Sequence, residues 1–94
     1  MDFAFDPDKS RSNEERHGVS LSWATSLWDE SHIIMSAKSS SGEARDFILA
    51  KPGGKCYVAV FTMRGDVVRI ISCHRADRRL ERIYENITAK AKSS

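Results

Sequence analysis

The sequence has few of the residues that mark secreted or membrane proteins. Its two cysteines, Cys56 and Cys73, are too few for a disulfide scaffold. We expect both to be reduced thiols in the core. The register of the hairpin decides whether they face each other. No apolar run approaches the ~20 residues that span a bilayer, and the acidic start "MDFAFDPDK" lacks the apolar region of a signal peptide. These absences favour a cytoplasmic protein without membrane contact.

The scattered Cys and His residues form no zinc-binding pattern, so we expect no metal and no cofactor. The chain has 94 residues, of which 40% are apolar and 30% charged, and this predicts one domain, residues 1–94, with a single core. Residues 1–50 carry five Lys or Arg and nine Asp or Glu (5 − 9 = −4), whereas residues 51–94 carry ten and four (10 − 4 = +6). The basic half suggests an anionic partner such as a nucleic acid, and the alternative is a solvated helix face that binds nothing.

The first half of the chain predicts a short strand and two helices. "FAFDP" is typical of a short strand that runs into a helix over about 7–17, with Asp6 as the N-cap and Gly18 at the left-handed position after the end. This helix is polar on nearly every side, so we expect it to be exposed or to lie across something polar. A second helix begins near Ser20 and has apolar residues at helical spacing: Leu21, Ala24, Leu27 and Trp28.

The second half predicts strands followed by one helix. "HIIMSAK", "ARDFILAK", "CYVAVFTM" and "VVRIISCH" are typical of strands, separated by the loop "SSSGE" and the turns "PGGK" and "RGD", where Gly65 supplies a positive φ. From the N-cap Asp77 onward the apolar spacing becomes helical. We predict an α+β fold in which an antiparallel sheet of three to four strands packs with two N-terminal helices and one C-terminal helix.

Short segments spread over most of the chain form a recognisable set: "FAFDPDK", Asn13 followed by "RHGVS", "GEAR", "FTMRG", "RIISCHRA" and "YE". In this order and at these separations they resemble the BrnT family, the toxins of bacterial type II toxin–antitoxin pairs. The chain departs from the family pattern at His74, where Arg is usual, and Arg75 follows it. It also departs at Leu80, where Glu is common, and Glu81 follows one position later.

The resemblance implies a metal-independent endoribonuclease with a RelE-like sheet, which inhibits translation and growth by cutting RNA. It also implies a BrnA-like antitoxin with a ribbon-helix-helix part, which holds the toxin inactive in a heteromeric complex. That complex would repress its own promoter, so this chain would reach DNA only through the antitoxin. The alternative, which the departure at His74 keeps open, is an attenuated or non-catalytic module that binds RNA or the antitoxin.

RNA cleavage without a metal needs a base for the 2′-OH, cations around the phosphate and an acid for the leaving oxygen. Arg64, Arg69 and Arg75 are the candidate phosphate ligands, because a guanidinium grips two phosphate oxygens at once. Strict alternation along the strand places Arg69 and Arg75 on one face and His74 on the other, from which it would reach round the strand's end. The alternative for Arg69 is a salt bridge to a neighbouring strand.

Two histidines are the candidate acid and base, since imidazole titrates near neutral pH. His17 ends the first predicted helix, where the helix dipole favours the imidazolium form, so it is suited to donate a proton or to bind phosphate. Its alternative role is to cap the last helix carbonyls. His74 is the second candidate, and no motif surrounds His32.

Four further cations are predicted to bind RNA. Arg78 and Arg79 begin the last helix, where basic residues oppose the helix dipole, and this placement suggests a use in gripping RNA or an acidic antitoxin segment. The alternative is that nearby acidic residues compensate them. Lys9 and Arg45 complete the set, and the alternative for Arg45 is a surface ion pair with Glu43.

Overall fold

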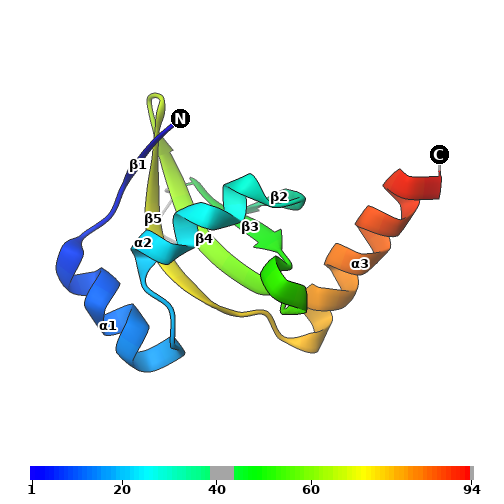
Figure 1. The fold of residues 1–94 in the computed structure, drawn as a ribbon. Helices are drawn as coiled ribbons and strands as arrows, with labels where there is room; N and C mark the ends of the chain where they lie inside the picture. The colour runs from blue at the N-terminus through cyan, green and yellow to red at the C-terminus, as the bar shows by residue number, and fades with distance from the viewer. Residues whose placement is uncertain (39–43, 94) are drawn as a thin grey trace.

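One five-stranded sheet and three α-helices make up the described part of the fold (Figure 1). A computed structural model of the chain describes residues 1–38 and 44–93, so the predicted loop "SSSGE" lies outside the described residues. The elements follow in the order β1 (Asp2–Ala4), α1 (Pro7–His17), α2 (Leu21–Ala24), η1 (Thr25–Asp29), β2 (His32–Lys38), β3 (Ala44–Ala50), η2 (Pro52–Gly54), β4 (Tyr57–Arg64), β5 (Val67–Arg75) and α3 (Arg78–Ser93). The strand order in the sheet is β1-β5-β4-β3-β2.

The α+β class is confirmed, but the sheet is mixed and has one strand more than predicted. Strands β2 to β5 form the antiparallel part, whereas β1 pairs in parallel with the start of β5. A strand of three residues carries too little sequence pattern to show which neighbour it joins or in which direction. The second predicted helix is also shorter: regular α-helix covers Leu21–Ala24 and continues as the 3-10 helix Thr25–Asp29.

The sheet buries residues on both faces. On one face, the second helical segment packs Leu21, Ala24 and Leu27 against strand residues such as Ile48, Phe61 and Ile70. On the other face, which we call the α3 face, a smaller cluster forms from Leu49, Cys56, Val58 and Tyr84. No helix in the described part of the chain is long and apolar enough to cross a membrane.

One extra residue in β5 changes which side chains share a face. Val60 lies opposite Ser72 and Phe61 lies opposite Ile70, so that Ile71 has no partner and forms a bulge. As a result Ile70 and Cys73, three positions apart, are both buried in one core cluster.

The bulge corrects the predicted arrangement of the arginines. Beyond Ile71 the alternation is shifted by one residue, so Arg69 lies on the α3 face together with Ser72 and His74. Arg75 lies on the opposite face. The prediction that Arg69 and Arg75 share a face is therefore wrong.

The register also separates the two thiols. Ala59 lies opposite Cys73, whereas the carbonyl oxygen of Cys56 accepts a hydrogen bond from the amide of Ala76. Both cysteines are buried and free. Burial raises the pKa of the Cys73 thiol to about 12, which keeps it protonated and unreactive at neutral pH.

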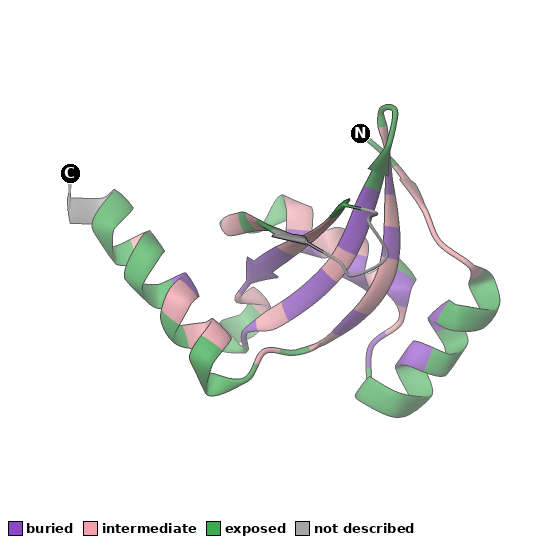
Figure 2. Ribbon diagram, turned by 180° about the vertical axis from the view of Figure 1, so that it is seen from behind, coloured by how far each residue is buried: buried purple, intermediate pink, exposed green. Residues whose placement is uncertain are grey.

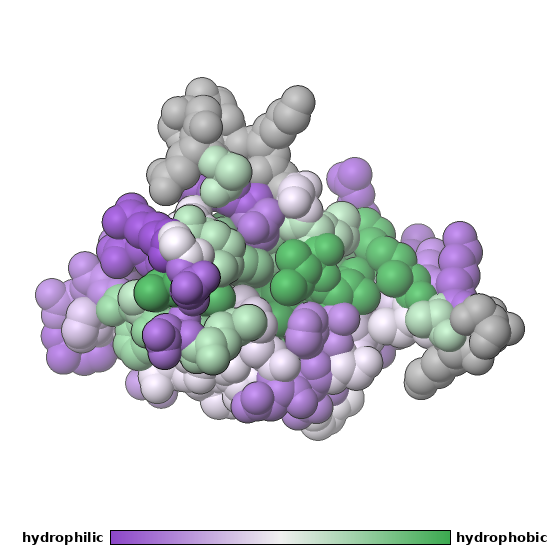
Figure 3. All heavy atoms as spheres, turned by 90° about the horizontal axis from the view of Figure 1, so that it is seen from above, coloured by the Kyte–Doolittle hydropathy of each residue, from purple (hydrophilic) through white to green (hydrophobic). Residues whose placement is uncertain are grey.

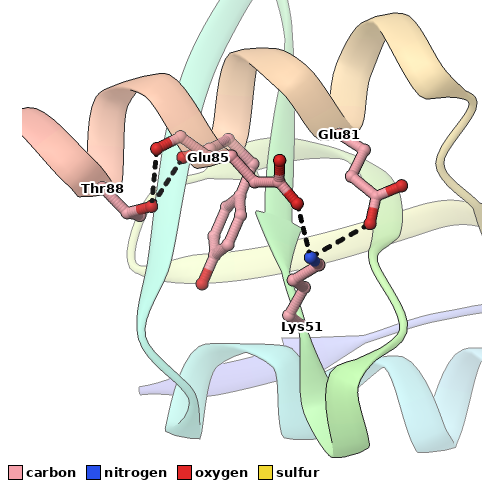
Figure 4. Close-up of polar contacts among 5 residues, drawn as sticks. Lys51, Glu81, Glu85 and Thr88 are labelled. Carbon is pink, nitrogen blue, oxygen red and sulfur yellow. Dashed lines mark hydrogen bonds and ion pairs between the residues drawn. The ribbon is translucent and has the colours of Figure 1, made fainter.

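An ion-pair cluster fixes the start of α3 against the end of β3 (Figure 4). The Nζ of Lys51 lies 2.7 Å from Oε1 of Glu85 and 3.1 Å from Oε2 of Glu81. Hydrogen bonds to these two carboxylates, Glu85 first, raise the pKa of the Lys51 ammonium above its usual range. Its contribution to stability is thus complete below the unfolded pKa of about 10.4 and is lost only as the pH rises above that value.

We expect Lys51→Met to loosen α3 without unfolding the sheet. The variant leaves two carboxylates one helical turn apart without their shared cation, so they repel each other. Amide hydrogen exchange over the first turns of α3 should become faster, while amides of β4 and β5 keep their protection. Lys55→Met is the control, because Lys55 is exposed and outside this cluster. Unchanged exchange in α3 would show that apolar packing alone holds the helix.

Candidate active site

The local signals at both ends of α1 act as predicted. Asp6 is the N-cap, and its Oδ1 accepts hydrogen bonds from the amides of Asp8 at 2.8 Å and Lys9 at 3.3 Å. Gly18 ends the helix with φ +80°, a conformation that glycine adopts without strain. The helix therefore ends with His17 in its last turn, as the sequence predicts.

Two buried polar side chains attach α1 to the rest of the chain. Figure 2 shows that most of α1 is exposed, and its buried residues are Ser10 and Asn13. The hydroxyl of Ser10 accepts hydrogen bonds from the amides of Leu21 at 3.0 Å and Ser22 at 3.4 Å. These bonds join α1 to the start of α2.

Asn13 joins α1 to the edge of β5. Its Nδ2 donates to the carbonyl oxygens of Cys73 and Val19, both at 2.7 Å, and its Oδ1 accepts from the amide of Cys73 at 3.2 Å. The amide side chain thus pairs with both backbone groups of Cys73, as a neighbouring strand would. Because β1 pairs only with the first three residues of β5, α1 takes the place of a strand along the rest of that edge.

A pocket of about 330 Å³ lies between α1 and β5. Its lining consists of Lys9, Ser12, Asn13, Arg16 and His17 from α1, with Ile71 and Ser72 from β5. The bulge places Ile71 at this edge, so the irregularity of β5 forms one wall of the pocket. Three of the lining side chains are basic, and the pocket is therefore suited to an anion such as a phosphate.

The two predicted catalytic histidines meet beside this pocket. The ring centroids of His17 and His74 are 5.5 Å apart, although the residues are far apart in the chain. Nδ1 of His74 lies 2.8 Å from the carbonyl oxygen of Arg75. Since a carbonyl can only accept, Nδ1 carries a proton, and in the neutral ring Nε2 is left with a free lone pair. This contact leaves Nε2 of a neutral His74 ring available as an acceptor.

The arginines of the hairpin do not gather at one place. Arg69 is half-buried on the same face as Ser72, and it forms no ion pair with a carboxylate in the described residues, so the alternative of a structural salt bridge is not observed. Arg64 lies opposite Val67, seven residues from His74, which is about 20 Å along a strand. Arg64 is therefore remote from the histidine pair.

Arg75 points to the face that carries the second helical segment. Its guanidinium carbon lies 5.7 Å from the centre of the Tyr57 ring, a cation–π contact. Tyr57 in turn packs edge-to-face on Trp23, with ring centroids 4.7 Å apart. In this position Arg75 supports His74 through its carbonyl oxygen, while its charged group lies away from the α3 face.

The other predicted RNA-binding residues lie in three places. Lys9 lines the pocket, and Arg78 and Arg79 are exposed at the start of α3. Arg45 lies on β3, and its predicted alternative partner, Glu43, is outside the described residues. Sequence reasoning missed Ser12, Arg16 and Ser72. A signal for the first two existed, because Lys9, Ser12 and Arg16 follow helical spacing on one face.

In the described residues, no group of three or more His, Cys, Asp and Glu side chains is placed to hold a metal ion. The site is instead made of cations and imidazoles. Its segments coincide with a known family: the family model for "Ribonuclease toxin, BrnT, of type II toxin-antitoxin system" matches residues 5–79.

The chain belongs to the BrnT family. The match confirms the resemblance and covers α1, the bulge in β5 and both histidines. Membership identifies a ribonuclease toxin of a type II toxin–antitoxin system, with RNA as the target and an antitoxin as the partner. No curated protein matches the chain.

Proposed function

We propose that this BrnT-family chain is a metal-independent endoribonuclease whose catalytic centre is the His17–His74 pair beside the α1–β5 pocket. The observation that carries the proposal is the approach of these two rings to 5.5 Å at the rim of a basic pocket. Two imidazoles at one phosphate supply both a base and an acid, so a metal-bound hydroxide is not required.

In the proposed reaction, Nε2 of His74 takes the proton of the ribose 2′-OH. The 2′-oxygen attacks the adjacent phosphorus, and the bond from phosphorus to the 5′-oxygen breaks. His17 gives its proton to the leaving 5′-oxygen. The products are a 2′,3′-cyclic phosphate and a 5′-hydroxyl end, and a proton exchange with water restores both histidines.

The basic side chains of the pocket support the same step. Lys9 and Arg16 line it beside His17. Cations aimed at the phosphoryl oxygens stabilise the charge that develops there, and one such donor contributes about 3–4 kcal/mol in comparable sites. Arg69, without a carboxylate partner among the described residues, is the candidate for binding the next phosphate along the α3 face.

The test is cleavage of a labelled oligoribonucleotide by the purified chain in the presence of EDTA. We expect products that end in a 2′,3′-cyclic phosphate, and no cleavage at a position where the 2′-OH has been replaced by hydrogen. The 2′-deoxy position is the internal control, because the proposed nucleophile is absent there. Cleavage across that position, or a requirement for a divalent metal, would contradict the mechanism.

A non-catalytic module that binds RNA or antitoxin is the second candidate, favoured by His74 at a position where the family usually has Arg. It predicts that the oligoribonucleotide stays intact but binds, with an affinity that falls steeply as salt rises. A plain interaction protein predicts no RNA affinity even at low salt.

Several further properties follow the family and form part of this proposal. The chain acts as one domain in the cytoplasm and inhibits translation and growth by RNA cleavage. Its sheet and helices have a RelE-like arrangement. Its antitoxin is BrnA-like, with a ribbon-helix-helix part through which the complex reaches DNA.

A further inference from the structure

Apolar side chains remain accessible where α3 leaves the sheet. Tyr84 is buried and its hydroxyl donates to the carbonyl oxygen of Ser31 at 3.0 Å, which anchors the middle of α3 beside the start of β2. One turn later Ile87 is 44% exposed. Figure 3 shows apolar atoms gathered in a continuous band that runs towards α3.

The strands add half-buried apolar residues on the same side. Ile33 and Met35 of β2 and Phe47 of β3 pack against the small core cluster beneath α3. Together with Ile83 and Ile87 of α3 they form what we call the α3 patch.

A half-buried cation, Arg45, borders the α3 patch. Arg45 is two residues before Phe47 on β3, so both side chains lie on the α3 face. Nε of Arg45 is buried and has no hydrogen-bond partner among the described residues. A buried guanidinium nitrogen without an acceptor is costly, and a bound carboxylate would satisfy it.

We propose that the α3 patch is the docking surface for the antitoxin, and that an antitoxin segment places apolar side chains on Ile87 and Met35 and a carboxylate on Arg45. The occupant's identity rests on the proposed function, because the family assigns a toxin an antitoxin. A protein fits this surface better than RNA does, since aliphatic side chains offer nothing to phosphates, whereas the basic pocket beside α1 does.

The position of the α3 patch suggests how docking inhibits the toxin. His74 lies opposite Val58, Val58 lies opposite Leu49, and Phe47 is two residues from Leu49, so the patch and His74 share one sheet face. A protein segment seated on the patch lies on the same sheet face as His74, two strands away from β5, and we infer that it extends across β4 to cover the approach to the histidine pair. It would block RNA without touching either imidazole.

The test compares Ile87→Asp with Ile34→Asp. Ile34 is 51% exposed and belongs to the opposite face of β2, so it is a matched control for adding a charge to an exposed isoleucine. The probe is the cognate antitoxin, with affinity measured by titration calorimetry. We expect Ile87→Asp to weaken the complex about tenfold or more and Ile34→Asp to change it less than about twofold. Arg45→Gln should also weaken it about tenfold.

Each variant is also assayed alone for RNA cleavage and for oligomeric state. We expect Ile87→Asp to cleave like the wild type but to escape inhibition by the antitoxin. Wild-type antitoxin affinity in Ile87→Asp would overturn the proposal. A loss of RNA affinity in that variant would also overturn it, because the patch would then bind RNA. A dimer of the free chain that Ile87→Asp dissociates would overturn it as well, because the patch would then bind a second copy. If the chain binds antitoxin through the patch but does not cut RNA, the proposed function is refuted and the docking proposal stands.

Discussion

His17→Ala and His74→Ala should each lower the rate of RNA cleavage by about 10²–10⁴, because each removes one proton-transfer group from the same transition state. The double variant should be little slower than the slower single variant, since residues that act as a unit are not additive. The rate for the wild type should fall on both the acidic and the alkaline side of an optimum, as expected when one group must be protonated and the other not. Initial rates on a fluorescent oligoribonucleotide measure all three effects.

The control for this series is His32→Ala. His32 also places Nδ1 near a backbone carbonyl, that of Glu30 at 2.8 Å, but it lies on β2, outside the pocket. Its removal should leave the cleavage rate unchanged. His74→Arg tests the catalytic role of His74: the proposal expects a loss, because arginine cannot serve as a base, whereas a toxin that is attenuated by histidine at this position should gain activity. A gain would remove His74 from the catalytic role.

Asn13→Asp should lower the free energy of unfolding by about 2–4 kcal/mol, through lost hydrogen bonds and buried groups left without partners. The substitution preserves the size of the side chain but replaces its donating NH₂ with an oxygen. That oxygen would face the carbonyl oxygens of Val19 and Cys73, both now 2.7 Å from Nδ2. Cleavage should be lost with it, because α1 carries Lys9, Arg16 and His17 into the pocket.

Urea denaturation of Asn13→Asp and Asn13→Ala measures this effect. Ser12→Ala is the control for stability, since Ser12 is the exposed neighbour on the same helix and should change the free energy of unfolding by less than about 0.5 kcal/mol. Equal stability of the wild type and Asn13→Asp would mean that apolar contacts, and not this amide, hold α1 against β5.

The features that could be predicted from the sequence are those decided by a few neighbouring residues. The caps Asp6 and Asp77 and the positive φ at Gly18 and Gly65 were all expected, and each depends on one side chain or its absence. Apolar segments between a loop and glycine-containing turns likewise predicted the strands. These signals are local, so they do not depend on how the rest of the chain packs.

The candidate site could be predicted only in part, because its geometry depends on one irregularity. Ile71 is as compatible with a regular strand as its neighbours are, and an isoleucine at this position does not predict a bulge. That single unpaired residue places Arg69 and Arg75 on opposite faces of the sheet, where strict alternation had put them on the same face. Arg64 was also predicted wrongly to join the site. It belongs to the same hairpin as His74 but lies at the opposite end of the strands.

The polar attachment of α1 has a consequence for how the protein opens. A helix held by the hydroxyl of Ser10 and the amide of Asn13 buries little apolar surface, so detaching it exposes little. Heat capacity and sensitivity to denaturant both scale with exposed surface and would barely change in that step. The α1 wall of the pocket can therefore detach as a separate unit while the sheet stays folded, and under the proposed mechanism RNA cleavage is then lost before the sheet unfolds.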